Sequence, residues 1–397
     1  MPRSSEPTTP PSPPRYRRLD ALRGVAILGV ILFHAYIIRP FHGPWWMNFV
    51  GQGAEGVGLF YMVSALTLAL SWQHRRSRDR SPRRAFWARR FFRIAPLFYL
   101  TLLLVWLAGS GNPTVVPPSM RHHIFTWPNL IAHLTFGFGW LPWFQNSWIG
   151  VEWSIGVEMT FYFLFPWLIE QVVPPAKPWS LLTAGVASAL AWPWLLHHLW
   201  FSWPRWAKSF AVFSFPEQMI WFAAGFSVFT MRARPNWKGW GVLWFLGGIA
   251  LGVHAWSPLT ANLVWVLPNL GLLWLAWHDH PGVRWLTRNR VIQYVGTRSY
   301  SLYLLHWLIL AQIANMSWAS QPTTIDWTMR VLAGLAVSLV AAEIAYRWIE
   351  RPGIALGREL IKRQGWGSRA DPRSRPAPAA QNRPAYVRSM AGRGSHR

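Results

Sequence analysis

The sequence predicts an all-α fold, a polytopic transmembrane helical bundle of about ten spans with both termini in the cytoplasm. Apolar residues make up 52% of the 397 and gather in long blocks, and blocks of about 18 or more are typical of transmembrane helices. Only 13% of the residues are charged, whereas soluble globular chains carry roughly a quarter. The basic residues cluster in particular loops, and such clusters indicate the cytoplasmic side.

Ten apolar blocks have a length close to the roughly 20 residues that a bilayer requires. They lie near residues 20–38, 55–72, 92–109, 150–172, 179–197, 211–230, 238–254, 261–277, 292–313 and 328–348. Glycine and proline interrupt the block 128–143, so we expect a re-entrant or interfacial segment there.

Basic clusters alternate with these blocks. With the N-terminus inside, ten spans place nearly all clusters on the cytoplasmic side, whereas an odd number would leave one outside. The inside clusters are Arg15, Arg17 and Arg18; residues 75–84 with Arg89, Arg90 and Arg93; Arg232, Arg234 and Lys238; Arg284, Arg288 and Arg290; and the C-terminal tail. The net charge of +25 is therefore explained by topology, and we expect no nucleic-acid partner.

Composition divides the chain into three parts. We expect a disordered basic segment at 1–17, a transmembrane domain at 18–352 and a basic, largely disordered tail at 353–397. The chain has no cysteine, which excludes disulfides and cysteine-based zinc sites. The "HDH" triplet at 278–280 has no further ligands nearby, so we expect a solvated loop and no metal.

The first block carries a polar stripe. Arg23 and His34 are eleven residues apart, which is three helical turns plus about 20°, and Asp20 lies on the same face. The rise along the axis is about 16 Å, which places Asp20 and Arg23 near the cytoplasmic boundary and His34 in the outer half. Asp20 and Arg23 could be boundary anchors, and His34 could bond a neighbouring helix. An ionisable group inside a span is costly, however, and usually lines a polar cavity.

The motif "RLDALRG…FH" at 18–34 resembles the opening of acyltransferase family 3, the integral-membrane O-acyltransferases. Five further segments resemble this family in the same order. They are "GVGLFYMVSALTLAL" (56–70), "RRFFRIAPLFYL" (89–100), "WSIGVEMTFYFLFP" (153–166), "SYSLYLLHW" (299–307) and "YRWIERP" (346–352). Gly58 stands where the family often has a polar residue, with Glu55 as a substitute one turn earlier.

The resemblance implies transfer of an acyl group, acetyl in the first instance, from cytoplasmic acyl-CoA. The acceptor would be a hydroxyl of an extracytoplasmic glycan, glycolipid or other glycosylated product, and the enzyme would lie in the bacterial inner membrane. His34 would act as the base or transient acyl acceptor, because imidazole moves protons near neutral pH. Arg23 would orient the donor or offset developing charge, and Asp20 would hold Arg23.

Arg90 and Arg93 share one helix face at the predicted cytoplasmic side. Guanidinium groups suit the phosphates of CoA, although a basic loop beside an anionic leaflet needs no ligand.

Glu158 and Tyr162 also share a face (i, i+4) inside a span. Glu158 would orient His34 or, like Tyr162, bind the acceptor sugar. Trp153 would stack on that sugar or lie at the membrane interface.

Ser299, Tyr303 and His306 follow one face (i, i+4, i+7). They are candidates for substrate binding, or form a hydrogen-bonded seam between helices. We expect the closing helix to end at Pro352.

Two rival functions need no bond chemistry. A transporter or flippase for polysaccharide intermediates could use the polar stripe as a pathway, but no internal repeat is evident. A sensing membrane protein would need no histidine within a span.

Overall fold

The computed structural model describes residues 14–107, 125–172, 178–199, 209–233, 239–252, 258–316 and 323–368. Within these ranges every regular element is a helix, and the only strand-like pairing is an isolated bridge between Asp79 and Ser368. The all-α prediction is confirmed.

The predicted blocks correspond to helices. The described elements are α1 (Pro14–Ile37), α2 (Met47–Gly51), η1 (Gln52–Glu55), α3 (Gly56–Arg75), α4 (Pro82–Leu107), α6 (Trp127–Leu134), η3 (Gly137–Trp140), α7 (Trp153–Val172), α8 (Pro178–Leu199), α10 (Phe210–Phe213), α11 (Phe215–Met231), α12 (Trp240–Gly252), α13 (Pro258–Trp277), α14 (Pro281–Thr287), α15 (Arg290–Thr297), α16 (Ser299–Ala314), α17 (Thr324–Ala345), the π-helix η5 (Tyr346–Glu350) and α18 (Arg351–Arg363). α1 begins at Pro14, inside the predicted N-terminal disordered segment.

The block 292–313 is divided into α15 and α16, contrary to the prediction of one span. Arg298 leaves helical geometry there, with φ −104° and ψ 6°. Its guanidinium donates to Glu343 of α17 at 2.7 Å. The break therefore places a charged side chain against a partner on the neighbouring helix.

The prediction that the closing helix ends at Pro352 is wrong. η5 joins α17 to α18, and the helix continues to Arg363, so the predicted tail begins with a helix. Pro352 is tolerated in the first turn of α18, where the α-helical bonding pattern starts again after the π-helix.

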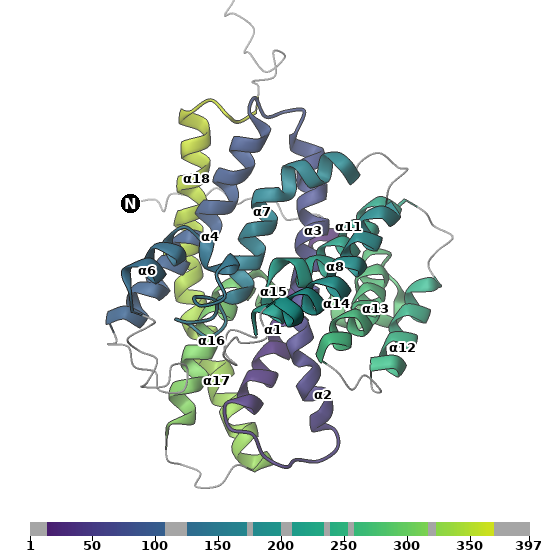
Figure 1. The fold of residues 1–397 in the computed structure, drawn as a ribbon, viewed down its shortest axis with the longest axis vertical. Coiled ribbons are helices and arrows are strands. Elements are labelled where there is room, and N and C mark those ends of the chain that lie inside the picture. Colours follow the sequence, from purple (N-terminus) through teal and green to yellow (C-terminus); the bar gives the residue numbers. More distant parts are fainter. Residues whose placement is uncertain are drawn as a thin grey trace, which may run out of the picture.

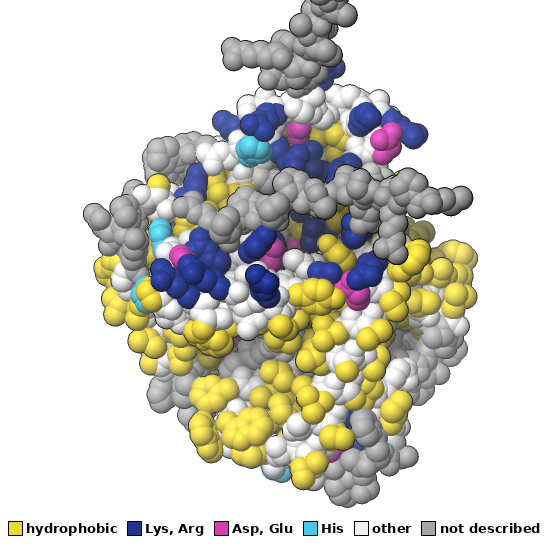
Figure 2. Space-filling model, turned by 180° about the vertical axis from the view of Figure 1, so that it is seen from behind, with side chains coloured by type: hydrophobic (Ala, Val, Ile, Leu, Met, Phe, Trp, Pro, Cys, Tyr) yellow, Lys and Arg dark blue, Asp and Glu magenta, His cyan; other side chains and the backbone are white. Residues whose placement is uncertain are grey.

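Among the residues that the structure describes, four helical segments are long and apolar enough to cross a bilayer: Tyr16–Ile37, Met47–Arg75, Pro82–Leu107 and Thr324–Arg363. Shorter apolar helices accompany them, among them Trp240–Gly252. Figure 2 shows that one half of the visible face is largely hydrophobic, whereas Lys and Arg gather in the other half. This segregation fits a protein held in a membrane. Ten spans and cytoplasmic termini stay predictions.

α1 occupies the centre of the bundle, with contacts to α3 and to α13 through α17 (Figure 1). It crosses α15 closely: a Cβ at Gly24 would lie 2.2 Å from the Ile292 carbonyl oxygen, and one at Gly296 1.6 Å from that of Asp20. Two glycines thus permit a crossing that any larger residue would block. The polar stripe of α1 is held rigidly by this packing.

α18 lies along α4 (Figure 1). Gly353 and Gly357 face Phe92 of α4, where an added Cβ would meet its backbone oxygen or side chain at 2.7–2.8 Å. The basic C-terminal helix is thereby fixed beside the arginine-rich start of α4.

Candidate active site

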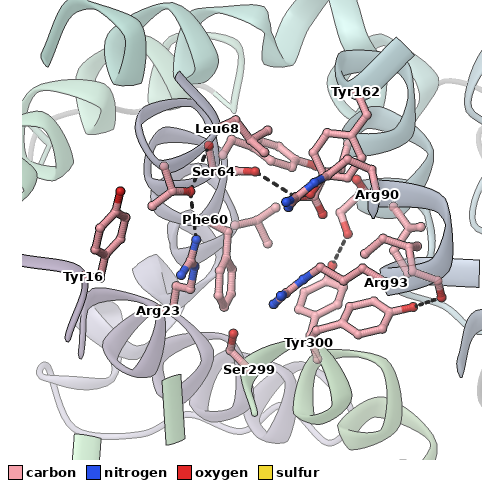
Figure 3. Close-up of a pocket in the computed structure, with 18 residues that line it drawn as sticks. Tyr16, Arg23, Phe60, Ser64, Leu68, Arg90, Arg93, Tyr162, Ser299 and Tyr300 are labelled. Atoms are coloured by element: carbon pink, nitrogen blue, oxygen red, sulfur yellow. Dashed lines mark hydrogen bonds between the residues drawn. The ribbon is translucent and has the colours of Figure 1, made fainter. Parts of the chain in front are cut away.

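A cavity of about 240 Å³ lies between α1, α3, α4, α7 and α16. We call it the central cavity. Its lining residues are Tyr16, Arg23, Val57, Phe60, Tyr61, Ser64, Thr67, Leu68, Arg90, Arg93, Ile94, Ser154, Ile155, Glu158, Tyr162, Ser299, Tyr300 and Tyr303. Figure 3 shows Arg90 and Arg93 directed from α4 into this space, with Arg23 of α1 across from them.

The central cavity brings together most of the site residues predicted from the sequence. Those on its wall are Arg23, Arg90, Arg93, Glu158, Tyr162, Ser299 and Tyr303. The described lining does not include Asp20, His34, Trp153 or His306. The predicted residues therefore fall into a cavity group and an outlying group.

Arg23 is held from two helices. It donates to Asp20 at 2.8 Å and to the Thr67 hydroxyl of α3 at 3.0 Å. Thr67 in turn bonds the Val63 carbonyl at 2.8 Å. The Asp20 contact is the one expected from the sequence, whereas Thr67 has no sequence signal beyond its place in an apolar helix. Together they fix the guanidinium at the cavity wall.

Glu158 belongs to a polar group on α3 and α7. It accepts a hydrogen bond from Ser64 at 3.0 Å and a short one from Tyr162. Both bonds end on Oε1 of Glu158, and the expected contact with His34 is absent from the hydrogen bonds described for this residue. Glu158 instead places negative charge opposite the arginines of α4.

The two arginines of α4 differ in their partners. Arg93 lies 3.6 Å from the buried Glu350 carboxylate, which accepts from Ser301 at 3.0 Å. The Arg90 guanidinium lies 5.9 Å from the ring centres of Phe86 and Tyr162, and its Nε has no hydrogen-bond partner among the described residues. Glu350 was missed by sequence reasoning, which placed it at a helix end.

His34 contacts His306 directly, with 2.8 Å between His34 Nδ1 and His306 Nε2. His306 Nδ1 lies 2.6 Å from the Tyr303 carbonyl oxygen and 3.1 Å from that of Leu302. Carbonyls only accept, so His306 Nδ1 carries hydrogen and its Nε2 accepts from His34 Nδ1. This arrangement leaves Nε2 of neutral His34 with a free lone pair.

Tyr303 links the histidine pair to the central cavity. Its ring lines the cavity and lies 5.7 Å from the His306 ring. The Tyr303 hydroxyl donates to the Val151 carbonyl at 3.0 Å and accepts from Ser154 at 2.7 Å. Arg23 lines the central cavity, whereas His34 is not among the described lining residues, and Tyr303 lies on the cavity wall next to His306.

Trp153, predicted to stack on a sugar or to lie at the membrane interface, is not among the described lining residues of the central cavity. Its ring stacks on Phe213 at 4.3 Å with an interplanar angle of 19°. One face is thus occupied by protein, which fits ordinary aromatic packing.

Gly58 is explained by packing: a Cβ there would lie 2.4 Å from the ring of Trp221. An indole occupies the space where the family often has a polar side chain, and Glu55 does not line the described cavity.

Residues 127–152 form an irregular segment organised by Glu152, which sequence reasoning missed. Its carboxylate accepts from the backbone amides of Trp148, Ile149 and Gly150 at 2.6–3.1 Å. His133 of α6 lies 3.7 Å away, and both side chains are fully buried. The short helix α6 is thereby tied to the start of α7.

The "HDH" triplet forms ion pairs. Asp279 accepts from Arg288 at 2.7 Å and lies 3.2 Å from Arg18 of α1. Burial alone would raise the pKa of Asp279, but the Arg288 hydrogen bond and the charges of Arg18 and Arg284 lower it. No group of three or more potential metal ligands occurs among the described residues.

Residues 16–347 match the family model described as an acyltransferase domain. The chain belongs to acyltransferase family 3. The predicted acyltransferase identity is confirmed. No solved structure matches the chain.

Three curated relatives match most of this chain, and two of them are named as acyl-transferring enzymes. The chain is 26% identical to acyltransferase MdmB of Streptomyces mycarofaciens, over 92% of this chain and 98% of the relative. It is 22% identical to peptidoglycan O-acetyltransferase OatA of Listeria monocytogenes, over 84% of this chain and 55% of that protein. Nodulation protein 10 of Rhizobium leguminosarum is 23% identical over 87% of this chain and 95% of its own length.

Proposed function

We propose that this chain is a multi-pass O-acyltransferase of a bacterial inner membrane. It transfers an acyl group, acetyl in the first instance, from cytoplasmic acyl-CoA to a hydroxyl of an extracytoplasmic glycan, glycolipid or other glycosylated acceptor. The observation that carries this proposal is the adjacency of an arginine-lined cavity to an imidazole pair with one free nitrogen. Acyl transfer needs such a cationic site for the donor and a base for the acceptor.

The histidine pair would activate the acceptor. His34 Nε2 takes the hydroxyl proton while the oxygen attacks the thioester carbonyl, and the carbon–sulfur bond breaks to release the CoA thiolate. His306 accepts the hydrogen bond from Nδ1 of the resulting imidazolium and so orients it. This is a change from the substrate-binding role predicted for His306. The same nitrogen would be acylated if transfer proceeds in two steps.

The central cavity would hold the thioester end of the donor. Arg23, kept in place by Asp20 and Thr67, is positioned to offset charge that develops on the carbonyl oxygen. Arg90 and Arg93 would attract the anionic donor from the cytoplasmic side. Glu158, Tyr162, Ser299 and Tyr303 supply the remaining polar wall, where the reacting groups are oriented.

The relatives support the acceptor class. The name of OatA gives peptidoglycan as its acceptor, and several further relatives are named putative O-acetyltransferases. MdmB, which this chain matches over nearly its full length, is named only as an acyltransferase. The peptidoglycan acceptor in the name of OatA supports a glycan hydroxyl as the acceptor class.

Inverted membrane vesicles supplied with radiolabelled acetyl-CoA test the proposal. Label should enter a glycan or glycolipid fraction with the wild-type protein, and glycan masses of wild-type and deletion cells should differ by acetyl groups. Unlabelled fractions with unchanged masses would contradict the proposal. Sugar export without label would favour the transporter.

A further inference from the structure

A second cavity, of about 550 Å³, lies where the α3–α4 loop, the start of α4 and α18 meet. We call it the basic cavity, because six arginines and one lysine line it. The lining residues are Arg75, Asp79, Arg80, Arg89, Arg90, Arg93, Ile354, Arg358, Ile361, Lys362, Gly365, Gly367 and Ser368.

Basic side chains outnumber acidic ones in the lining of the basic cavity. Asp79 is the one acid in the described lining, and Arg89 donates to it at 2.6 Å. The side chains of Arg75, Arg358 and Lys362 make no hydrogen bond or ion pair with another described residue. Unpaired cations around one hollow repel each other, and a bound polyanion would relieve this repulsion.

The fold builds this arrangement. Close packing of Gly353 and Gly357 on Phe92 fixes α18 against α4. Arg358 and Lys362 are i and i+4 on α18 and so share one face. The cations are therefore carried by rigid helices and not by a loop alone.

The basic cavity adjoins the central cavity. Arg90 and Arg93 line both, and Figure 3 shows their guanidinium groups directed into the central cavity. Arg93 is also held by Glu350 at the π-helix that leads into α18. The two cavities therefore meet at these two side chains.

We propose that the basic cavity binds the phosphates at the nucleotide end of the acyl donor, through Arg75, Arg358 and Lys362. This deepens, and rests on, the proposed use of acyl-CoA. Guanidinium and ammonium groups recognise phosphate oxygens by charge-assisted hydrogen bonds. The uncharged pantetheine arm would then pass Arg90 and Arg93 and carry the thioester into the central cavity. An anionic lipid headgroup offers the same phosphate chemistry, so the test separates the two sources.

Two acyl donors test the basic cavity independently of the central cavity. Acetyl-CoA carries the nucleotide phosphates, whereas acetyl-pantetheine lacks them. With reconstituted full-length protein, the double variant Arg358→Ala, Lys362→Ala should raise the KM for acetyl-CoA at least about tenfold, since each lost charged contact costs about that factor. It should leave kcat and the KM for acetyl-pantetheine unchanged. Arg363→Ala is the matched control on the same helix, because Arg363 pairs with Glu359 and does not line the cavity.

An equal KM for acetyl-CoA in the double variant and the control would overturn the phosphate site while leaving acyl transfer intact. Calorimetry with adenosine 3′,5′-bisphosphate and the purified protein tests the phosphate site separately from the proposed acyl transfer. If acyl transfer is absent but the wild type binds this compound and the double variant does not, the phosphate site stands and the proposed function fails. The third outcome concerns lipid. If the double variant alters only the difference in activity between phosphatidylglycerol and phosphatidylcholine vesicles, the cavity binds a lipid headgroup and the proposal is overturned.

Discussion

The contact between His34 and His306 makes a quantitative prediction. His306→Ala removes the acceptor for His34 Nδ1, which lies 2.8 Å away. A hydrogen bond to a charged group contributes about 1.5–3 kcal/mol, and each 1.36 kcal/mol of activation free energy changes a rate about tenfold. The kcat for acetyl transfer should therefore fall about 10- to 150-fold, with little change in the KM for acetyl-CoA.

His306→Gln is the matched comparison. A glutamine amide oxygen can reach the place of Nε2 and accept from His34, so this variant should retain more activity than His306→Ala. Both are measured as initial rates in proteoliposomes that contain equal amounts of folded protein. Wild-type kcat in His306→Ala, or equal losses in the alanine and glutamine variants, would refute the orienting role.

Other variants test separate parts of the site. His34→Ala should abolish acylation in vesicles while the protein still inserts at normal levels. Retained activity would show that His34 is not the base. The double variant Arg90→Ala, Arg93→Ala should raise the KM for acyl-CoA more than the KM for the acceptor. An unchanged KM for acyl-CoA would mean that the two arginines only mark the cytoplasmic side of the membrane. Glu152→Gln should lower the free energy of unfolding by about 1–3 kcal/mol, because it removes the charge that three amides share; unaltered thermal unfolding in detergent would contradict this.

The sequence predicted those features that depend on local periodicity. The helices followed from apolar blocks, and the common face of Asp20 and Arg23 followed from helical geometry. Both residues indeed meet in the structure, at 2.8 Å. The face shared by Glu158 and Tyr162 likewise brought the two side chains into hydrogen-bond contact.

Features that depend on tertiary packing could not be predicted from the sequence. The contact of His34 with His306 joins residues 272 positions apart, so no spacing rule could reveal it. The continuation of the helix past Pro352 depends on the π-helix η5, which also brings Glu350 toward Arg93. Arg298 interrupts a predicted span, and its guanidinium donates to Glu343 on another helix, a contact that no local pattern could predict.

Label transfer across a sealed proteoliposome tests the central claim most directly. Radiolabelled acetyl-CoA is supplied on the side exposing the basic residues of α4, and a glycosylated acceptor on the other. Label should reach the acceptor with wild-type protein and should be lost with His34→Ala. Equal labelling by wild type and His34→Ala, or labelling by neither, would contradict acyl transfer through this site.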